Sequence, residues 1–175
     1  MDKINVGIIG AGRIGEIHGR NLQQVIKKAN VKAIADIFIQ SAQYAAAELN
    51  IPTVERDYRK LLENDNIEAV LICSSTDTHA QIIMEAAEAK KHIFCEKPIS
   101  LNLEAIDKRP DRLEMIGVKL EIGFNRRFDP GFRKARDIVA KGIIGIPHII
   151  KITSRDPEPP PYEYLKVSGG LFLDM

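Results

Sequence analysis

Short apolar runs alternate with amphipathic segments along the first 122 residues of the chain. Runs that are apolar on both faces are typical of buried parallel strands, and the segments between them repeat apolar residues at helical spacing. Strands are predicted at 4–9, 31–36, 53–55, 69–73, 92–95 and 119–122, and helices at 13–28, 41–49, 58–63 (capped by Asp57) and from 78 or 79 to 90. This order predicts an α/β protein with a doubly wound parallel sheet.

A glycine-rich loop follows the first predicted strand and opens the first helix. Gly10 permits a tight turn, Gly12 lets backbone N–H groups approach a pyrophosphate, and Gly15 lets the helix and strand pack closely. Asp36 ends the second strand, where a carboxylate accepts hydrogen bonds from ribose hydroxyls. The order predicts a Rossmann-type dinucleotide site, against the alternative of a glycine turn without a ligand. Cofactor contacts are expected from Gly10, Gly12, Arg13, Ile14, Gly15 and Asp36.

The residues after Asp36 bear on the choice of cofactor. Ile37 and Phe38 follow it, so neither arginine nor serine stands there to receive a 2′-phosphate, which the carboxylate itself would repel. The sequence therefore predicts NAD rather than NADP.

The character of the chain changes after residue 122. We expect an NAD-binding domain over residues 1–122 and the incomplete start of a second α/β domain over 123–175, with a helix at 131–141 and a strand at 148–154. Pro110 interrupts a helical pattern and predicts a break there. The proline-rich run at 156–161 predicts an extended loop, which is either a rigid linker or the border of an active site.

Composition narrows the class of protein. The 175 residues include 25 Lys and Arg against 24 Asp and Glu, a net charge of +1, so no nucleic-acid partner is expected. No apolar run approaches the length of a membrane span, and the chain enters a strand without a signal segment, so we expect a cytoplasmic protein without a membrane partner. Cys73 and Cys95 end apolar strands without metal-ligand spacing, and no metal site is expected.

Lys97 lies in Glu96-Lys97-Pro98, directly after a predicted strand. Open α/β sheets bind ligands at this edge, where an ammonium can stabilise negative charge on a reacting hydroxyl. The alternative is a solvated loop lysine. A cis peptide bond before Pro98 is a further expectation.

The chain resembles the Gfo/Idh/MocA oxidoreductase family over its whole length, and within it the inositol 2-dehydrogenases. The resemblance rests on GIIGAGRIGEIH, CSSTDTHA, HIFCEKPISLNLE, GFNRRFDPGF, ITSRDPEPPP and SGGLFLDM, which begin at residues 7, 73, 92, 123, 152 and 168. It implies NAD-dependent oxidation of a secondary hydroxyl of a polyol to a ketone. It also implies a homo-oligomer, a tetramer in relatives.

The resemblance assigns site residues by matching motifs. Lys97 matches the lysine that contacts the reacting hydroxyl, and Asp174 matches the aspartate of a D-x-x-x-H catalytic pair, whose histidine would follow Met175. Arg127 and Asp156 match positions near the polyol, whereas Asn125 and Arg126 have no assigned role. Further cofactor contacts are expected from Ser74, Thr76, His79, Glu96 and Lys97.

The sequence has four histidines, and none is a convincing substitute for the histidine of the catalytic pair. His79 is expected to be structural or to lie beside the nicotinamide, and His18 and His92 to have packing or surface roles; His148 begins a predicted strand. The chain as it stands is therefore expected to bind NAD without turnover. Two alternatives stay open: an NAD-binding module, or a dehydrogenase for another sugar or diol.

Overall fold

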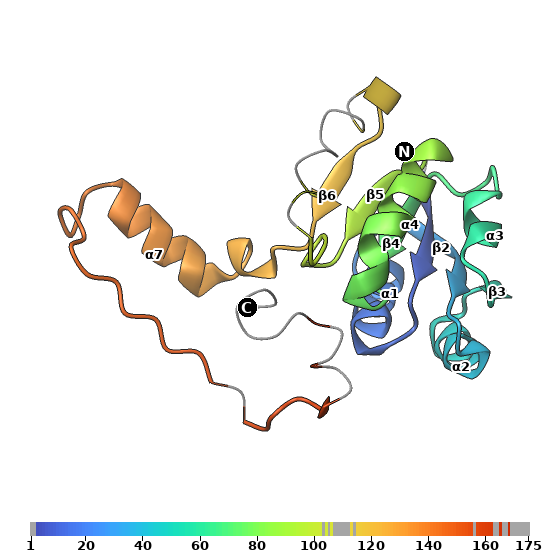
Figure 1. Cartoon of the computed structure of the whole chain (residues 1–175), viewed down its shortest axis with the longest axis horizontal. Coiled ribbons are helices and arrows are strands. Elements are labelled where there is room, and N and C mark those ends of the chain that lie inside the picture. The colour runs from blue at the N-terminus through green and yellow to red at the C-terminus, as the bar shows by residue number, and fades with distance from the viewer. Residues whose placement is uncertain are drawn as a thin grey trace.

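The computed structural model describes residues 3–102, 104, 106, 113, 115–155, 157–162, 165 and 168. Within these residues, parallel strands form one six-stranded sheet in the order β3-β2-β1-β4-β5-β6 (Figure 1). The strands are β1 (Ile4–Ile9), β2 (Ala29–Ala35), β3 (Thr53–Glu55), β4 (Ala69–Ile72), β5 (His92–Cys95) and β6 (Leu120–Ile122). The predicted doubly wound parallel sheet is confirmed, and the strand order reverses between β1 and β4.

Helices cover both faces of the sheet. They are α1 (Arg13–Gln24), α2 (Ile39–Leu49), α3 (Arg59–Leu62) and α4 (Thr76–Glu88). Side chains alternate between the faces of a strand, so Val70 and Ile72 of β4 pack with α3 and α4, whereas Leu71 faces the cluster that holds α2. On that second face, Gly19 of α1 lies against Ile8. The core is therefore two apolar layers separated by the sheet.

The end of α1 differs from the prediction. The sequence predicts a helix to Lys28, but α1 ends at Gln24. The next two N–H groups both bond to the carbonyl oxygen of Asn21, each at 2.9 Å, and β2 begins at Ala29, beside Ile4 of β1. Residues 25–28 therefore form the turn between α1 and β2, and the strand begins two residues before the predicted residue 31.

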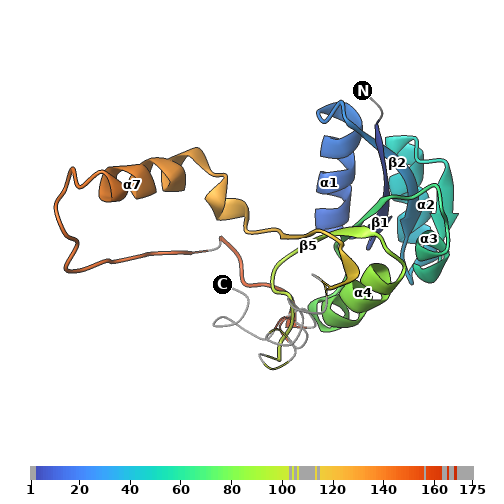
Figure 2. The same cartoon turned by 90° about the horizontal axis from the view of Figure 1, so that it is seen from above.

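The segment 124–155, here called the C-terminal arm, lies apart from the sheet (Figures 1 and 2). It contains the 3-10 turn η1 (Asn125–Arg127) and α7 (Pro130–Ala140), which Asp129 caps by accepting the N–H groups of Gly131 and Phe132 at 2.8 and 3.0 Å. The predicted strand at 148–154 is wrong, because these residues have no regular secondary structure and no described strand pairs with them. A strand needs a neighbour for its backbone hydrogen bonds.

Two other expectations concern prolines. Residues 157–161 lie in neither helix nor strand, as predicted, and Pro110 lies outside the described residues.

Among the helices that the structure describes, none has the length and apolar character needed to cross a lipid bilayer.

Candidate cofactor and substrate site

The predicted cofactor-binding residues, Lys97 among them, gather along the carboxyl edge of the sheet. Backbone hydrogen bonds tie the residue after each strand to its neighbour: Gly10 N–H donates to Ala35, Cys73 to Ile9, Glu96 to Ile72 and Gly123 to Cys95, all at 2.7–3.0 Å. Adjacent strands lie about 4.8 Å apart, so this row runs from the glycine loop to Glu96 across only two strand intervals. An extended ligand can follow it.

The glycine loop is closed by contacts that only glycine allows. Gly10 has a φ of +101°, and a Cβ there would come within 2.6 Å of the Cys73 backbone; a Cβ at Gly15 would overlap the Gly10 carbonyl group. Gly12, by contrast, faces open space and gives α1 no side-chain cap. The N–H groups at the start of α1, at Arg13, Ile14 and Gly15, are thus placed to meet a phosphate.

Asp36 lies beside this loop. Its Oδ2 accepts the N–H of Ala11 at 2.7 Å and its Oδ1 accepts the N–H of Phe38 at 2.8 Å. The two bonds orient the carboxylate, which is only partly buried, and each oxygen keeps a lone pair for a ribose hydroxyl. This arrangement fits the adenosine half of a dinucleotide.

His79 joins the loop after β4 to the loop after β5. Its buried ring has Nδ1 2.7 Å from the carbonyl oxygen of Pro98 and Nε2 3.1 Å from that of Ser74. The Ser74 hydroxyl in turn lies 2.7 Å from that of Thr78, while Thr76 begins α4 and is buried. Because both nitrogens of His79 meet backbone carbonyls, the ring suits a structural role.

Glu96 and Lys97 follow β5. The Glu96 Oε1 lies 2.7 Å from His18 Nε2, and its Oε2 accepts the N–H of Lys97 at 3.3 Å. Burial alone raises the pKa of Glu96, but the hydrogen bond and charge of His18, with those of Lys97, outweigh burial and hold that pKa below its usual range. The peptide bond between Lys97 and Pro98 is cis, as expected.

Sequence reasoning missed the bond between His18 and Glu96. The ring does pack, as expected, in a T-shaped contact with Phe94 at 5.2 Å. The sequence held one indication of this contact, namely the position of His18 near the start of α1, the helix that follows the glycine loop.

Of the expected substrate residues other than Lys97, the structure describes Arg127 alone. Arg127 lies exposed in η1, shortly after β6, and Arg126 lies over the ring of Phe132, 5.7 Å from its centre. Asp156 and Asp174 lie outside the described residues.

The two thiols have no place in this chemistry. Cys95 is fully buried, and burial, followed by the nearby Glu96 carboxylate, raises the pKa of Cys73 far above its usual range. With its pKa raised in this way, the Cys73 thiol stays protonated and makes a poor nucleophile and metal ligand. Over the described residues, no cluster of three His, Cys, Asp or Glu side chains could hold a metal ion.

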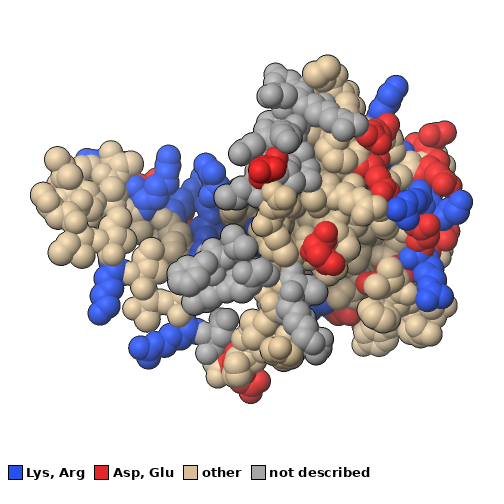
Figure 3. Space-filling model, viewed as in Figure 1, with Lys and Arg blue, Asp and Glu red and all other residues tan. Residues whose placement is uncertain are grey.

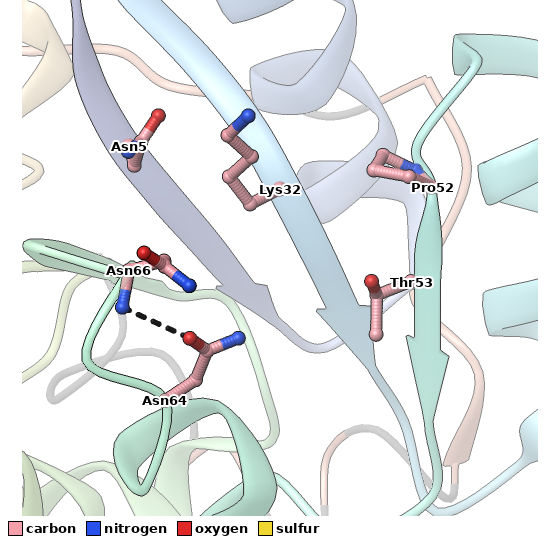
Figure 4. Close-up of a pocket in the computed structure, with 6 residues that line it drawn as sticks. All are labelled: Asn5, Lys32, Pro52, Thr53, Asn64 and Asn66. Carbon is pink, nitrogen blue, oxygen red and sulfur yellow. Dashed lines mark hydrogen bonds between the residues drawn. The ribbon is translucent and has the colours of Figure 1, made fainter.

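A separate hollow of about 400 Å³ lies at the opposite, amino edge of the sheet. Figure 4 shows its lining, with the N–H of Asn66 donating to the side chain of Asn64 at 2.9 Å. The lining residues are Asn5, Lys32, Pro52, Thr53, Asn64 and Asn66, none of which belongs to the predicted site.

The parallel sheet, the glycine loop at its switch point and the oriented acid together define a Rossmann protein of the dinucleotide-binding class. Comparison with known families agrees: residues 4–124 match the model of the Gfo/Idh/MocA oxidoreductase family, described as having an NAD-binding Rossmann fold. The chain belongs to this family. The predicted family, fold and NAD-binding character are confirmed.

Individual relatives carry more specific names. The chain is 46% identical, over 98% of its length, to a myo-inositol 2-dehydrogenase of Thermotoga maritima, and 98% of it matches the crystal structure of a probable dehydrogenase from that organism with a TM-score of 0.91 and 46% identity. A scyllo-inositol dehydrogenase from Lactobacillus casei, solved with NAD(H) and scyllo-inositol bound, matches 82% of the chain with a TM-score of 0.78 and 36% identity.

The matches cover only part of each relative. The chain spans about half the length of the myo-inositol 2-dehydrogenase and of the Thermotoga structure, and 43% of the Lactobacillus protein.

Proposed function

We propose that this chain is the cofactor-binding part of an NAD-dependent dehydrogenase that oxidises a secondary hydroxyl of an inositol-type polyol. The observation that carries the proposal is the row along the carboxyl edge, which runs from the oriented Asp36 carboxylate past the open N-terminus of α1 to Lys97. The names of the relatives support the substrate class. We also propose the domain division at residue 122, where the described apolar layers end.

Different residues on this edge bind different parts of the cofactor. Asp36 accepts the adenosine ribose hydroxyls, and the first N–H groups of α1 donate to the pyrophosphate. Ser74, Thr76 and His79, with Glu96, border the nicotinamide half, where the loops after β4 and β5 meet. When bound there, NAD supplies the hydride acceptor for the reaction.

Lys97 acts on the substrate. Its ammonium donates a hydrogen bond to the polyol oxygen and stabilises the negative charge that develops as the hydroxyl proton and the carbinol hydride leave. Arg127 and Asp156 contact the other hydroxyls, and Asp174 belongs to the catalytic pair that removes the proton. These four roles follow from motif matches and are part of the proposal.

A second candidate function is NAD binding without turnover by the chain of 175 residues. It is favoured by the histidines: both ring nitrogens of His79 lie against carbonyl oxygens, and Nε2 of His18 lies against Glu96. Neither ring is oriented to take a proton from a substrate. A positioned base contributes about 10²–10⁴-fold to the rate of such a reaction.

Calorimetry with NAD and NADP, followed by absorbance of the reduced cofactor with myo-inositol and scyllo-inositol, tests both candidates. We expect NAD to bind more tightly than NADP. Asp36→Ala should reduce the difference in affinity between the two cofactors, because the carboxylate that repels the 2′-phosphate is then absent. Equal affinity for the two cofactors contradicts the proposal. Turnover by this chain rejects the second candidate and makes His79→Ala the next variant to assay.

We further propose that the protein is a homo-oligomer in the cytoplasm. Exposed apolar side chains in the C-terminal arm, among them Phe132, Ile146 and Ile149, support association with another copy. Light scattering of the purified chain tests this, and a monomer at all concentrations contradicts it.

A further inference from the structure

His18 links the helix that begins at the glycine loop to the strand that ends at Lys97. It lies on α1, and its half-buried ring contacts Phe94 of β5 edge-on, with the ring planes at 64°. Its Nε2 lies 2.7 Å from Glu96 Oε1, although the two residues are 78 positions apart in sequence. Ring packing and a hydrogen bond therefore hold α1 to the carboxyl end of β5.

Glu96 connects this contact to Lys97. One carboxylate oxygen faces His18, while the other accepts the backbone N–H of Lys97 at 3.3 Å. The Gly123 backbone lies beside the group, and a Cβ at Gly123 would come within 3.0 Å of all three carboxylate atoms. The carboxylate is thus confined on three sides, and its lowered pKa keeps it ionised, which strengthens both hydrogen bonds.

We propose that His18 is a positioning residue that acts through the Glu96 carboxylate to hold the backbone of Lys97 at a set distance from the pyrophosphate-binding end of α1. The role rests on the proposed function, in which α1 holds the phosphates and Lys97 meets the substrate. Reacting groups must be placed within fractions of an ångström, and an internal hydrogen bond from one ligand-holding element to another achieves this.

Two substitutions separate the hydrogen bond from the ring packing. His18→Ala removes both. His18→Gln removes the ring but leaves an amide N–H at about the reach of imidazole Nε2, so that it can still donate to Glu96. A role in packing alone predicts that the two variants behave alike, whereas the positioning role predicts that glutamine restores function.

The experiment combines two measurements on the whole chain: the amide proton shift of Lys97 in ¹⁵N-labelled protein, and the calorimetric dissociation constant for NAD. In His18→Ala we expect the Lys97 amide to move toward its unstructured value and NAD to bind about tenfold more weakly, because a charge-assisted hydrogen bond is lost. His18→Gln should return both values to near those of the unsubstituted chain. The matched control is His92→Ala, which removes a histidine from the amino end of β5, the strand that Glu96 follows. This variant should change neither the Lys97 amide shift nor the dissociation constant.

The Lys97 amide shift tests the proposal whether or not the chain binds NAD. An unchanged Lys97 amide in folded His18→Ala, or a His18→Gln variant that behaves like His18→Ala, overturns it. If His18→Ala does not fold, Glu96→Gln replaces it, and an unchanged amide and dissociation constant there overturn it equally. If the unsubstituted chain binds no NAD, the proposed function fails, while the Lys97 amide still decides whether His18 positions that backbone.

Discussion

The sheet and the C-terminal arm use similar apolar residues in opposite ways. Ile83 of α4 is fully buried, whereas Ile149 in the arm is 88% exposed. The helices of the sheet region pack their apolar sides on strands, while α7 has no buried residue. Apolar composition alone therefore does not make a core; a segment also needs a partner surface to cover it.

Charge also separates the two regions. Figure 3 shows Lys and Arg side chains gathered over the arm, whereas Asp and Glu side chains lie among Lys and Arg side chains over the sheet region in this view. Within 125–141 the basic residues are Arg126, Arg127, Arg133, Lys134, Arg136 and Lys141, against Asp129 and Asp137. The near-neutral charge of the whole chain thus conceals a basic arm.

The comparison predicts that an Ile→Ala substitution lowers the free energy of unfolding by different amounts in the two regions. Ile83→Ala should lower the free energy of unfolding by about 2–5 kcal/mol, because it leaves a cavity under α4. Ile149→Ala should change it by less than about 0.5 kcal/mol, because the side chain is already in water. Urea denaturation measures both, and similar costs would mean that the arm is packed in solution.

Cofactor binding should depend on the sheet region and not on the arm. Gly15→Ala should weaken NAD binding at least about hundredfold, because the added methyl overlaps the Gly10 carbonyl group and opens the phosphate loop. Phe132→Ala, in the arm, should leave the dissociation constant within about twofold. Calorimetry tests both, with circular dichroism to verify the fold; retention of affinity by Gly15→Ala would place the phosphate elsewhere.

Self-association should depend on the arm and not on the sheet region. Ile149→Lys should raise the concentration needed for association at least about tenfold, because a charge replaces an apolar contact surface. Lys151→Ala, two residues away, is the control and should not raise it. Analytical ultracentrifugation measures the change, and equal association by Ile149→Lys would exclude this part of the arm from the interface.

The smallest expected effect is a pH dependence from Glu96. Its pKa is lower in the folded than in the unfolded chain, so the folded state binds fewer protons near pH 4 and stability rises with pH there. The contribution is complete above the unfolded pKa of about 4.3 and is lost as the pH falls through the folded value. Glu96→Gln should reduce this rise in the free energy of unfolding with pH, measured by urea denaturation at a series of acidic pH values. If the free energies of the variant and the unsubstituted chain depend on pH in the same way, the His18 contact is absent in solution.

The fold and the cofactor loop were predictable from local signals. The glycine spacing after β1 reflects close contacts that no side chain fits, and the apolar runs of β4 and β5 reflect burial on both faces. The strand expected at 148–154 failed for the converse reason. Its apolar residues match a strand pattern, but no described strand pairs with them.

The sequence by itself determined the parallel sheet, the phosphate loop and the acid at Asp36, because each depends on neighbouring residues or on a spacing within one βαβ unit. Only the tertiary structure decided that Asp36 receives the N–H of Ala11, that His79 meets two carbonyl oxygens, and that His18 meets Glu96. These contacts join separate loops, and their partners follow from how strands line up at the sheet edge. Hydrophobic periodicity carries no information about that alignment.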